Sequence, residues 1–232
     1  MPQKKFICIF GALFLIGNIS FGQQKNDAGM WNTLSFQYAL SKKTNIVVDE
    51  ELRLKENYQR INLFYTNVGI SYKLNKFIKI DPTYRFIQKL RLEGSYSFRH
   101  RFMLDVTAKK KIRNFTLSER IRYQIEVADY NTSKKGKLAE QFLRFKTDLK
   151  YALNKKISPY ISCELRYQIR SPKGDDPQYD GEFHRIRNVL GVEYQFNKKN
   201  SVNLYYLIQS EFNISSPESI YILGIGYSFV IK

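Results

Sequence analysis

The stretch FYTNVGISYKLNK, residues 64–76, decides the fold class of this 232-residue chain. Every second position from Phe64 to Leu74 except Thr66 carries a large apolar or aromatic side chain, and mostly small or polar residues stand between them. A period of two predicts a β-strand, because successive side chains of a strand point to opposite faces of a sheet. The run closes on Tyr-x-Leu and then enters a polar turn, Asn75-Lys76.

The same closing phrase, Tyr followed by any residue and then Leu or Phe, occurs five times, and four copies lead into a turn that contains lysine. Aromatic rings with a polar edge prefer the boundary between membrane hydrocarbon and water. We therefore expect a girdle of interfacial aromatic residues at one end of the strands. The basic segment Lys109–Lys111 lacks the tyrosine, so we expect a turn there and a gap in the girdle. The girdle residues are Tyr38, Tyr72, Tyr151, Tyr194, Phe196, Tyr227 and Phe229.

Alternating segments fill the chain from residue 30 onward. Many are longer than the usual five or six residues of a strand and match the ~9–11 residues that a tilted strand needs to cross a bilayer. Short connections alternate with longer ones, which is typical of outer-membrane barrels. The expected strands lie at about residues 30–40, 45–54, 61–74, 77–87, 95–108, 112–127, 138–153, 157–169, 183–196, 201–209 and 219–230.

The sequence thus predicts an all-β, antiparallel up-and-down transmembrane β-barrel of ten to twelve strands. The first expected strand runs toward a short turn and the last one ends at that same side, so antiparallel closure requires one more strand. This parity favours twelve, with residues 23–29 as the candidate extra strand. Pro82 and Pro159 fall inside expected strands, and we expect bulges or rims there because proline donates no backbone hydrogen bond.

Residues 1–22 are predicted to be a secretory signal peptide. Lys4 and Lys5 precede an apolar stretch that is too short to span a membrane as a helix, and Ser20 and Gly22 provide small residues for cleavage. Residues 23–232 would then form a single domain in the outer membrane of a Gram-negative bacterium. Its expected partners are membrane lipids and the barrel-assembly machinery. Export and the dispersed net charge of +17 argue against nucleic acid as a partner.

Alternation alone does not say which face of the barrel meets lipid. Ten to twelve strands enclose more space than apolar side chains would fill, so we expect the polar face to line the lumen. A lumen rich in Arg and Lys favours small anions, whereas Arg–carboxylate pairs would plug it. The candidate pore-lining residues are Glu51, Arg53, Arg85, Arg99, Arg101, Arg120, Arg122, Glu126, Arg144, Lys146, Glu164, Arg166, Arg185, Arg187 and Glu193.

We expect a structural barrel or a small pore, with no catalytic residue, cofactor or metal. One alternative is an outer-membrane lipid hydrolase or acyltransferase, for which His184 is the candidate because its phase points to lipid near the long-loop rim. His100 has the same outward phase, and neither histidine has a serine at triad-like spacing. Asp175, Asp176 and Asp180 lack regular calcium-ligand spacing. A second alternative is a soluble periplasmic ligand-binding barrel.

Several strand motifs resemble those of a known family of small outer-membrane barrels from Bacteroidetes, designated domain of unknown function 2490. The resemblance covers nearly all of the mature chain and implies a location and an architecture, but no activity or catalytic residue. The motifs are Gly29-Met30-Trp31, Glu50-Glu51-Leu52-Arg53-Leu54, Tyr84-Arg85-Phe86, His100-Arg101-Phe102, Glu119-Arg120-Ile121-Arg122-Tyr123 and Gly224-Ile225-Gly226-Tyr227-Ser228-Phe229.

Overall fold

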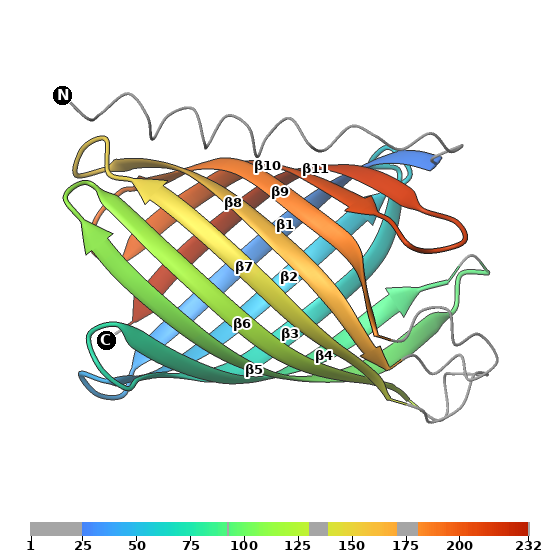
Figure 1. Cartoon of the computed structure of the whole chain (residues 1–232), viewed down its shortest axis with the longest axis horizontal. Coiled ribbons are helices and arrows are strands. Elements are labelled where there is room, and N and C mark those ends of the chain that lie inside the picture. Colours follow the sequence, from blue (N-terminus) through green and yellow to red (C-terminus); the bar gives the residue numbers. More distant parts are fainter. Residues whose placement is uncertain (1–24, 92, 130–138, 171–180, 232) are drawn as a thin grey trace.

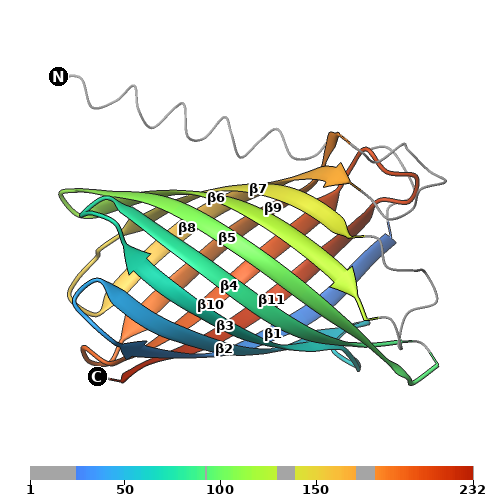
Figure 2. The ribbon, with the colours of Figure 1, turned by 90° about the horizontal axis from the view of Figure 1, so that it is seen from below.

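A computed structural model describes residues 25–91, 93–129, 139–170 and 181–231 as one closed barrel (Figure 1). The predicted signal peptide lies outside the described residues. Eleven strands wind obliquely around the barrel, and consecutive strands are neighbours throughout (Figures 1 and 2). No helix in the described ranges is long and apolar enough to cross a membrane. The strands are β1 (Lys25–Ala39), β2 (Thr44–Lys55), β3 (Arg60–Lys73), β4 (Ile78–Leu90), β5 (Tyr96–Ile112), β6 (Phe115–Ala128), β7 (Glu140–Tyr151), β8 (Ile157–Arg170), β9 (Glu182–Gln195), β10 (Asn200–Glu211) and β11 (Glu218–Ile231).

The barrel closes through a parallel pair, which resolves the parity problem of the sequence. β1 and β11 run in the same direction, in register from Lys25 opposite Glu218 to Tyr38 opposite Ile231. All other neighbouring strands are antiparallel. The residues from Lys25 to Gly29 extend β1 and do not form the extra strand that antiparallel closure required. The barrel therefore has eleven strands, a number within the predicted range of ten to twelve but not the favoured twelve.

Four of the short turns share one hydrogen-bonding pattern, which explains why Ser or Asn follows the repeated Tyr-x-Leu/Phe phrase. The side-chain oxygen of Asn75 accepts hydrogen bonds from the backbone N–H groups of Phe77 and Ile78, both at 2.8 Å. Ser41, Asn154 and Asn197 accept the equivalent pairs in their own turns. Such side chains replace backbone partners in tight turns. The repeat therefore specifies a strand end and its turn together.

The fifth short turn differs from its prediction. β5 continues through the three lysines to Ile112, and the chain reverses at Arg113 and Asn114. Arg113 has a φ of 53°, in the left-handed region. The ring of Phe115, the first residue of β6, lies 4.8 Å from the ring of Tyr151. An aromatic residue from the following strand therefore stands where a gap in the girdle was expected.

The two prolines occupy the irregular positions that their chemistry predicts. Pairing between β3 and β4 jumps from Gly69–Thr83 to Tyr72–Ile80, and Pro82 lies in the interruption. Pro159 lies beyond the last paired residues of β7 and β8, near the short-turn end. Each proline is thus unpaired on one side, where its missing N–H group is not needed, and stands in register on the other side with Leu104 or Val192.

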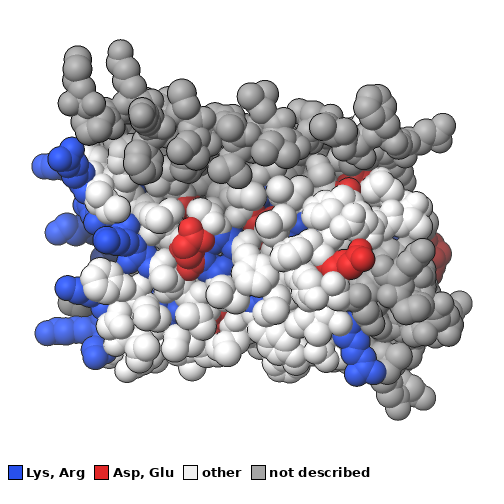
Figure 3. Space-filling model, in the orientation of Figure 1, with Lys and Arg blue, Asp and Glu red and all other residues white. Residues whose placement is uncertain are grey.

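The barrel carries its apolar side chains outside and its charged side chains inside. Leu34, Val68 and Phe102 are about half exposed on the outer face. Glu51 and Arg144, by contrast, are buried on the inner face. Lys and Arg gather beyond the short-turn end of the apolar surface, at the left of Figure 3. All seven predicted girdle residues lie close to this end of their strands or in the adjoining turn.

Two inward-facing glycines make room for tyrosine rings that reach over them from the neighbouring strand. A Cβ atom at Gly191 would lie 2.5 Å from the ring of Tyr160, and one at Gly224 would lie 1.9 Å from the ring of Tyr205. Both distances are far below normal van der Waals contact. Each tyrosine therefore packs flat over the backbone of the neighbouring strand, and this packing needs glycine.

Replacing Gly224 with Ala should destabilise the barrel, because the added methyl group would displace the Tyr205 ring. We expect a loss of about 1–3 kcal/mol in the free energy of unfolding, typical of overpacking. The measurement is urea unfolding in lipid vesicles, followed by the fluorescence of Trp31. Gly226→Ala is the matched control, since its added Cβ meets no atom closer than 3.8 Å. Equal losses in the two variants would contradict the packing argument.

Candidate functional site: the lumen

The lumen contains a cavity of about 1300 Å³. It extends from the long-loop end, at Asn26 and Ser216, to the level of Tyr160 and Asn203. Its wall carries thirteen Lys and Arg residues against nine Asp and Glu residues. The ion pairs inside the barrel thus leave a sizeable space, and the charges around that space are predominantly positive.

The structure places fourteen of the fifteen candidate pore-lining residues on the wall of this cavity. The other candidate, Glu193, lies nearer the short turns and pairs with Lys150 at 2.7 Å. Sequence reasoning overlooked the aromatic part of the wall, which includes Trp31, Tyr65 and Phe142. The sequence could have indicated that these residues face the lumen, because each lies in the same alternation phase as charged residues of its strand.

Four arginines from neighbouring strands stand side by side in the lumen. One arginine comes from each of the strands β6 to β9, and each stands directly opposite the next across the strand pair: Arg122, Arg144, Arg166 and Arg185. Asp105 on β5 and Glu211 on β10 continue the line at its two ends. We call these four arginines the arginine row. Because the strands are tilted (Figures 1 and 2), a line across them also climbs along the barrel axis.

Carboxylates hold the two ends and the middle of the arginine row. Asp105 accepts two hydrogen bonds from Arg122, at 2.6 and 2.7 Å, and Glu211 pairs with Arg185. In the middle of the row, Arg144 pairs with Glu164, which lies on β8 two residues before Arg166. Like charges directly opposite each other destabilise a sheet. The four arginines of the row therefore carry more positive charge than these three carboxylates neutralise.

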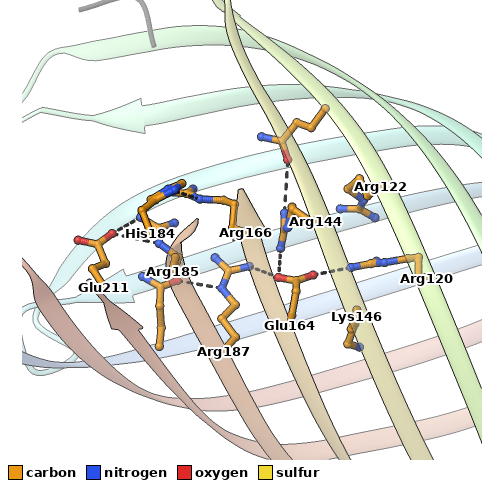
Figure 4. A network of polar contacts seen from close by, with 12 residues as sticks. Arg120, Arg122, Arg144, Lys146, Glu164, Arg166, His184, Arg185, Arg187 and Glu211 are labelled. Atoms are coloured by element: carbon orange, nitrogen blue, oxygen red, sulfur yellow. Dashed lines mark hydrogen bonds and ion pairs between the residues drawn. The ribbon is translucent and has the colours of Figure 1, made fainter. Parts of the chain in front are cut away.

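Glu164 is the centre of the ion-pair network drawn in Figure 4. It lies 2.5 Å from Arg120 and 3.3 Å from Arg187 and also pairs with Arg144. Only 7% of its side chain is exposed. One buried carboxylate thus connects three strands, β6, β7 and β9, to β8.

Two arginines on the wall have no carboxylate partner among the described residues. The Nε of Arg85 donates to Asn67 at 2.6 Å, and its guanidinium lies 3.6 Å from the centre of the Tyr65 ring. The Nε of Arg166 donates to the Nε2 of His184 at 2.7 Å. These neutral partners orient the guanidinium groups without neutralising them. The partly exposed Arg166 is available to a solute anion in the lumen, and the buried Arg85 adds unneutralised positive charge to the same wall.

Arg53, on β2, packs on aromatic rings on the other side of the lumen. The guanidinium of Arg53 lies 3.6 Å from the centre of the Trp31 ring and 5.3 Å from that of Tyr65. Glu51 pairs with Arg53 and accepts a hydrogen bond from Thr33 at 2.9 Å. Cation–π contact favours a charged guanidinium while fixing its position. This wall is therefore both positive and well ordered.

The outward orientation predicted for His184 is wrong. Pairing between β8 and β9 passes from Arg166–Arg185 to Tyr167–Phe183, so His184 is the extra residue of a β-bulge. The bulge turns its side chain toward the lumen, where it is buried beside Arg166. Alternation cannot be carried across such an insertion.

His100 takes the outward position that its phase indicates. It lies among the outer rings of β4 and β5, with its Nδ1 2.7 Å from the Tyr84 hydroxyl. The aspartates at 175, 176 and 180 lie outside the described residues. Within the described ranges, no group of three His, Cys, Asp or Glu residues is placed to hold a metal ion.

A closed barrel with an apolar outer face and a charged lumen has the architecture of outer-membrane-type β-barrels. The chain belongs to the family described as protein of unknown function (DUF2490), whose model matches residues 28–219. This confirms the family resemblance seen in the strand motifs, whereas an origin in Bacteroidetes stays a prediction. No curated protein matches the sequence.

Solved structures show the same fold at low sequence identity. The NanC porin superposes with a TM-score of 0.52 at 13% identity, covering 88% of this chain and 97% of the porin. The β domain of the Bordetella autotransporter BrkA gives a TM-score of 0.52 at 9% identity, covering 83% of this chain and 86% of that domain. At such identities the likeness establishes the architecture only.

Proposed function

We propose that this protein is an outer-membrane pore, exported through a cleaved signal peptide, whose lumen attracts and passes small anions. The observation that carries the proposal is the arginine row together with the excess of cations around the cavity. Rings and lines of Arg and Lys favour anions in pores. The fold shared with a porin is consistent with this role.

The arrangement suggests how an anion would move. Cross-strand neighbours have Cβ atoms about 5 Å apart, so an anion leaving one guanidinium of the row would already be near the next. The interspersed carboxylates would weaken binding at each position, because permeation requires that a solute leave as readily as it enters. Glu164 and Asp105 thus have a second role beside holding the arginines in place.

The apolar outer face argues against the soluble ligand carrier, one of the alternative functions. A soluble ligand carrier would need the opposite arrangement, with its apolar side chains inside the barrel. The lipid-enzyme alternative receives no support from His184, whose ring lies in the lumen beside Arg166. A structural barrel without conductance is therefore the main competitor, and one measurement separates it from a pore.

The test is purified protein in planar bilayers with KCl at different concentrations on the two sides. We expect discrete conductance steps and a reversal potential whose sign shows that chloride crosses more readily than potassium. A preference for potassium would overturn the anion pathway. A folded barrel, verified by its gel shift between unheated and boiled samples, that never conducts would overturn the pore itself.

A further inference from the structure

A row of aromatic side chains and glycines crosses the inner face of the barrel, from β1 to β8. Trp31 on β1 stands opposite Gly224 on β11, and Gly224 stands opposite Tyr205 on β10. The line continues through Gly191 on β9 to Tyr160 on β8. We call Trp31, Tyr205 and Tyr160 the aromatic row. All three line the lumen cavity and are half-buried, so part of each side chain is exposed to the space inside.

The two tyrosines of the aromatic row turn flat ring faces toward the cavity. Each ring rests with one face on a glycine, Tyr205 on Gly224 and Tyr160 on Gly191. Because both side chains line the cavity and are partly exposed, the opposite faces point into the cavity. The glycines carry no side chain that would enclose the rings. The aromatic row is therefore an apolar surface at the edge of the cavity, and not part of a packed core.

Two guanidinium groups lie at the Trp31 end of the aromatic row. That of Arg53 lies 3.6 Å from the centre of the Trp31 ring, and that of Arg187 lies 5.4 Å from the same point. Arg53 pairs with Glu51, whereas Arg187 shares Glu164 with two other arginines. The charge at this end of the row is therefore predominantly positive.

The hydroxyl groups of the two tyrosines differ in their partners. That of Tyr160 donates a hydrogen bond to the side-chain oxygen of Asn203 at 3.0 Å. That of Tyr205 is not buried and has no hydrogen-bond partner among the described residues. A phenolic hydroxyl can both donate and accept hydrogen bonds. Tyr205 therefore has a polar group available to a solute beside its ring face.

We propose that the aromatic row and the two guanidinium groups beside it bind ring-shaped anions, and that such anions are the solutes of the pore. The ring of the solute stacks on the Tyr205 face, and its carboxylate or phosphate lies against Arg53 and Arg187. Tyr205 covers the strand next to Trp31, and neighbouring strands are about 4.8 Å apart, so one small molecule reaches both. Aromatic faces favour flat apolar contacts, and guanidinium groups bind carboxylates and phosphates well. The inference rests on the proposed function, because the solute has to enter the lumen.

Rigid rings suit this site better than flexible chains do. A ring presents a preformed face to Tyr205, whereas an open chain must give up rotational freedom to lie flat on it. Chloride uses the positive charge alone. The site therefore distinguishes among anions by their shape, which the arginine row by itself does not do.

The fluorescence of Trp31, the only tryptophan of the chain, reports on occupation of the site. The purified protein in lipid vesicles is titrated with two pairs of anions of equal carbon number, cyclohexanecarboxylate against heptanoate and glucuronate against gluconate. We expect the ring to bind at least threefold more tightly than the open chain in one pair or both, and the pair identifies a hydrocarbon or a hydroxylated ring as the better solute. Equal affinity within both pairs would overturn the proposal. For the preferred ring, an uncharged analogue (cyclohexanecarboxamide or methyl glucoside) that binds as tightly as the anion would also overturn it.

Variants of the aromatic row test its part in this preference. Tyr160→Leu with Tyr205→Leu removes both ring faces and should make the affinities for ring and open chain equal. Tyr206→Leu is the matched control and should keep the preference, because Tyr206 follows Tyr205 on β10 but lies on the outer face, 46% exposed. The gel shift on heating verifies that each barrel is folded, and the wild-type comparison stands even where the double variant does not fold. A folded double variant that retains the preference contradicts the proposal.

Planar bilayers separate this inference from the pore itself. Ring anions should reduce the chloride current at lower concentrations than their open-chain partners do. A barrel that binds ring anions but never conducts would overturn the pore and leave the binding site. A barrel that conducts but does not discriminate between rings and chains would overturn the binding site and leave the pore.

Discussion

Replacing Glu164 with Gln is expected to lower the free energy of unfolding by about 3–5 kcal/mol, because removing one partner leaves buried charge without compensation. The carboxylate faces Arg120, Arg144 and Arg187, and its side chain is only 7% exposed. Gln retains the size of the side chain and one acceptor oxygen but loses the charge. Urea unfolding in lipid vesicles, followed by Trp31 fluorescence, measures the loss.

Glu193→Gln is the control for this change. Glu193 also pairs with a cation, Lys150, but the two side chains are 35% and 39% exposed. Exposed ion pairs contribute at most about 1 kcal/mol. A Glu164 variant no less stable than the Glu193 variant would show that the network of Figure 4 does not hold the strands together.

The second large effect concerns selectivity. Reversing the charge of Arg85 and Arg166, as Arg85→Glu with Arg166→Glu, should abolish the preference for chloride and shift the reversal potential toward that of potassium. Both residues lack a carboxylate partner among the described residues, so their charge raises the potential that solutes meet in the lumen. A change of two charges at ~8 Å in a water-filled lumen alters the energy of an anion by about 1 kcal/mol, or about fivefold for each site.

The control makes the same change in net charge outside the lumen. Lys155→Glu with Lys156→Glu reverses two exposed charges in the turn between β7 and β8. Screening by salt should make its effect on the reversal potential small. If the turn variant shifts the potential as much as the lumen variant, the selectivity arises at the mouth of the barrel and the arginine row is not the pathway.

Local sequence features predicted the strands because period two is a local property. The alternation of residues 64–74 and the repeated Tyr-x-Leu/Phe phrase place most strand ends within a few residues. The turn after β5 lies later than the sequence predicts. The three lysines at 109–111 resemble a polar turn, but they continue the pairing with β6 as far as Ile112. Lysine has no conformational requirement that would force a reversal, unlike Asn or Gly.

The candidate site was harder to predict, because it depends on how strands align with one another. Alternation indicates that Arg122, Arg144 and Arg166 face the same side, but not that they stand at one level. Their adjacency follows from the register between strands, which turn positions and bulges fix together. The bulge at His184 had no signal in the alternation, and it reversed the direction of that side chain.

The parallel seam between β1 and β11 places the first and last strand ends at opposite ends of the barrel, whereas antiparallel closure of an even-stranded barrel places both at the same end. β1 starts at the long-loop end, at Lys25, and β11 finishes at the short-turn end, at Ile231. In a membrane, these two points lie on opposite sides of the bilayer. If the barrel spans a membrane, a label fused ahead of Lys25 and one fused behind Ile231 would therefore report on different compartments.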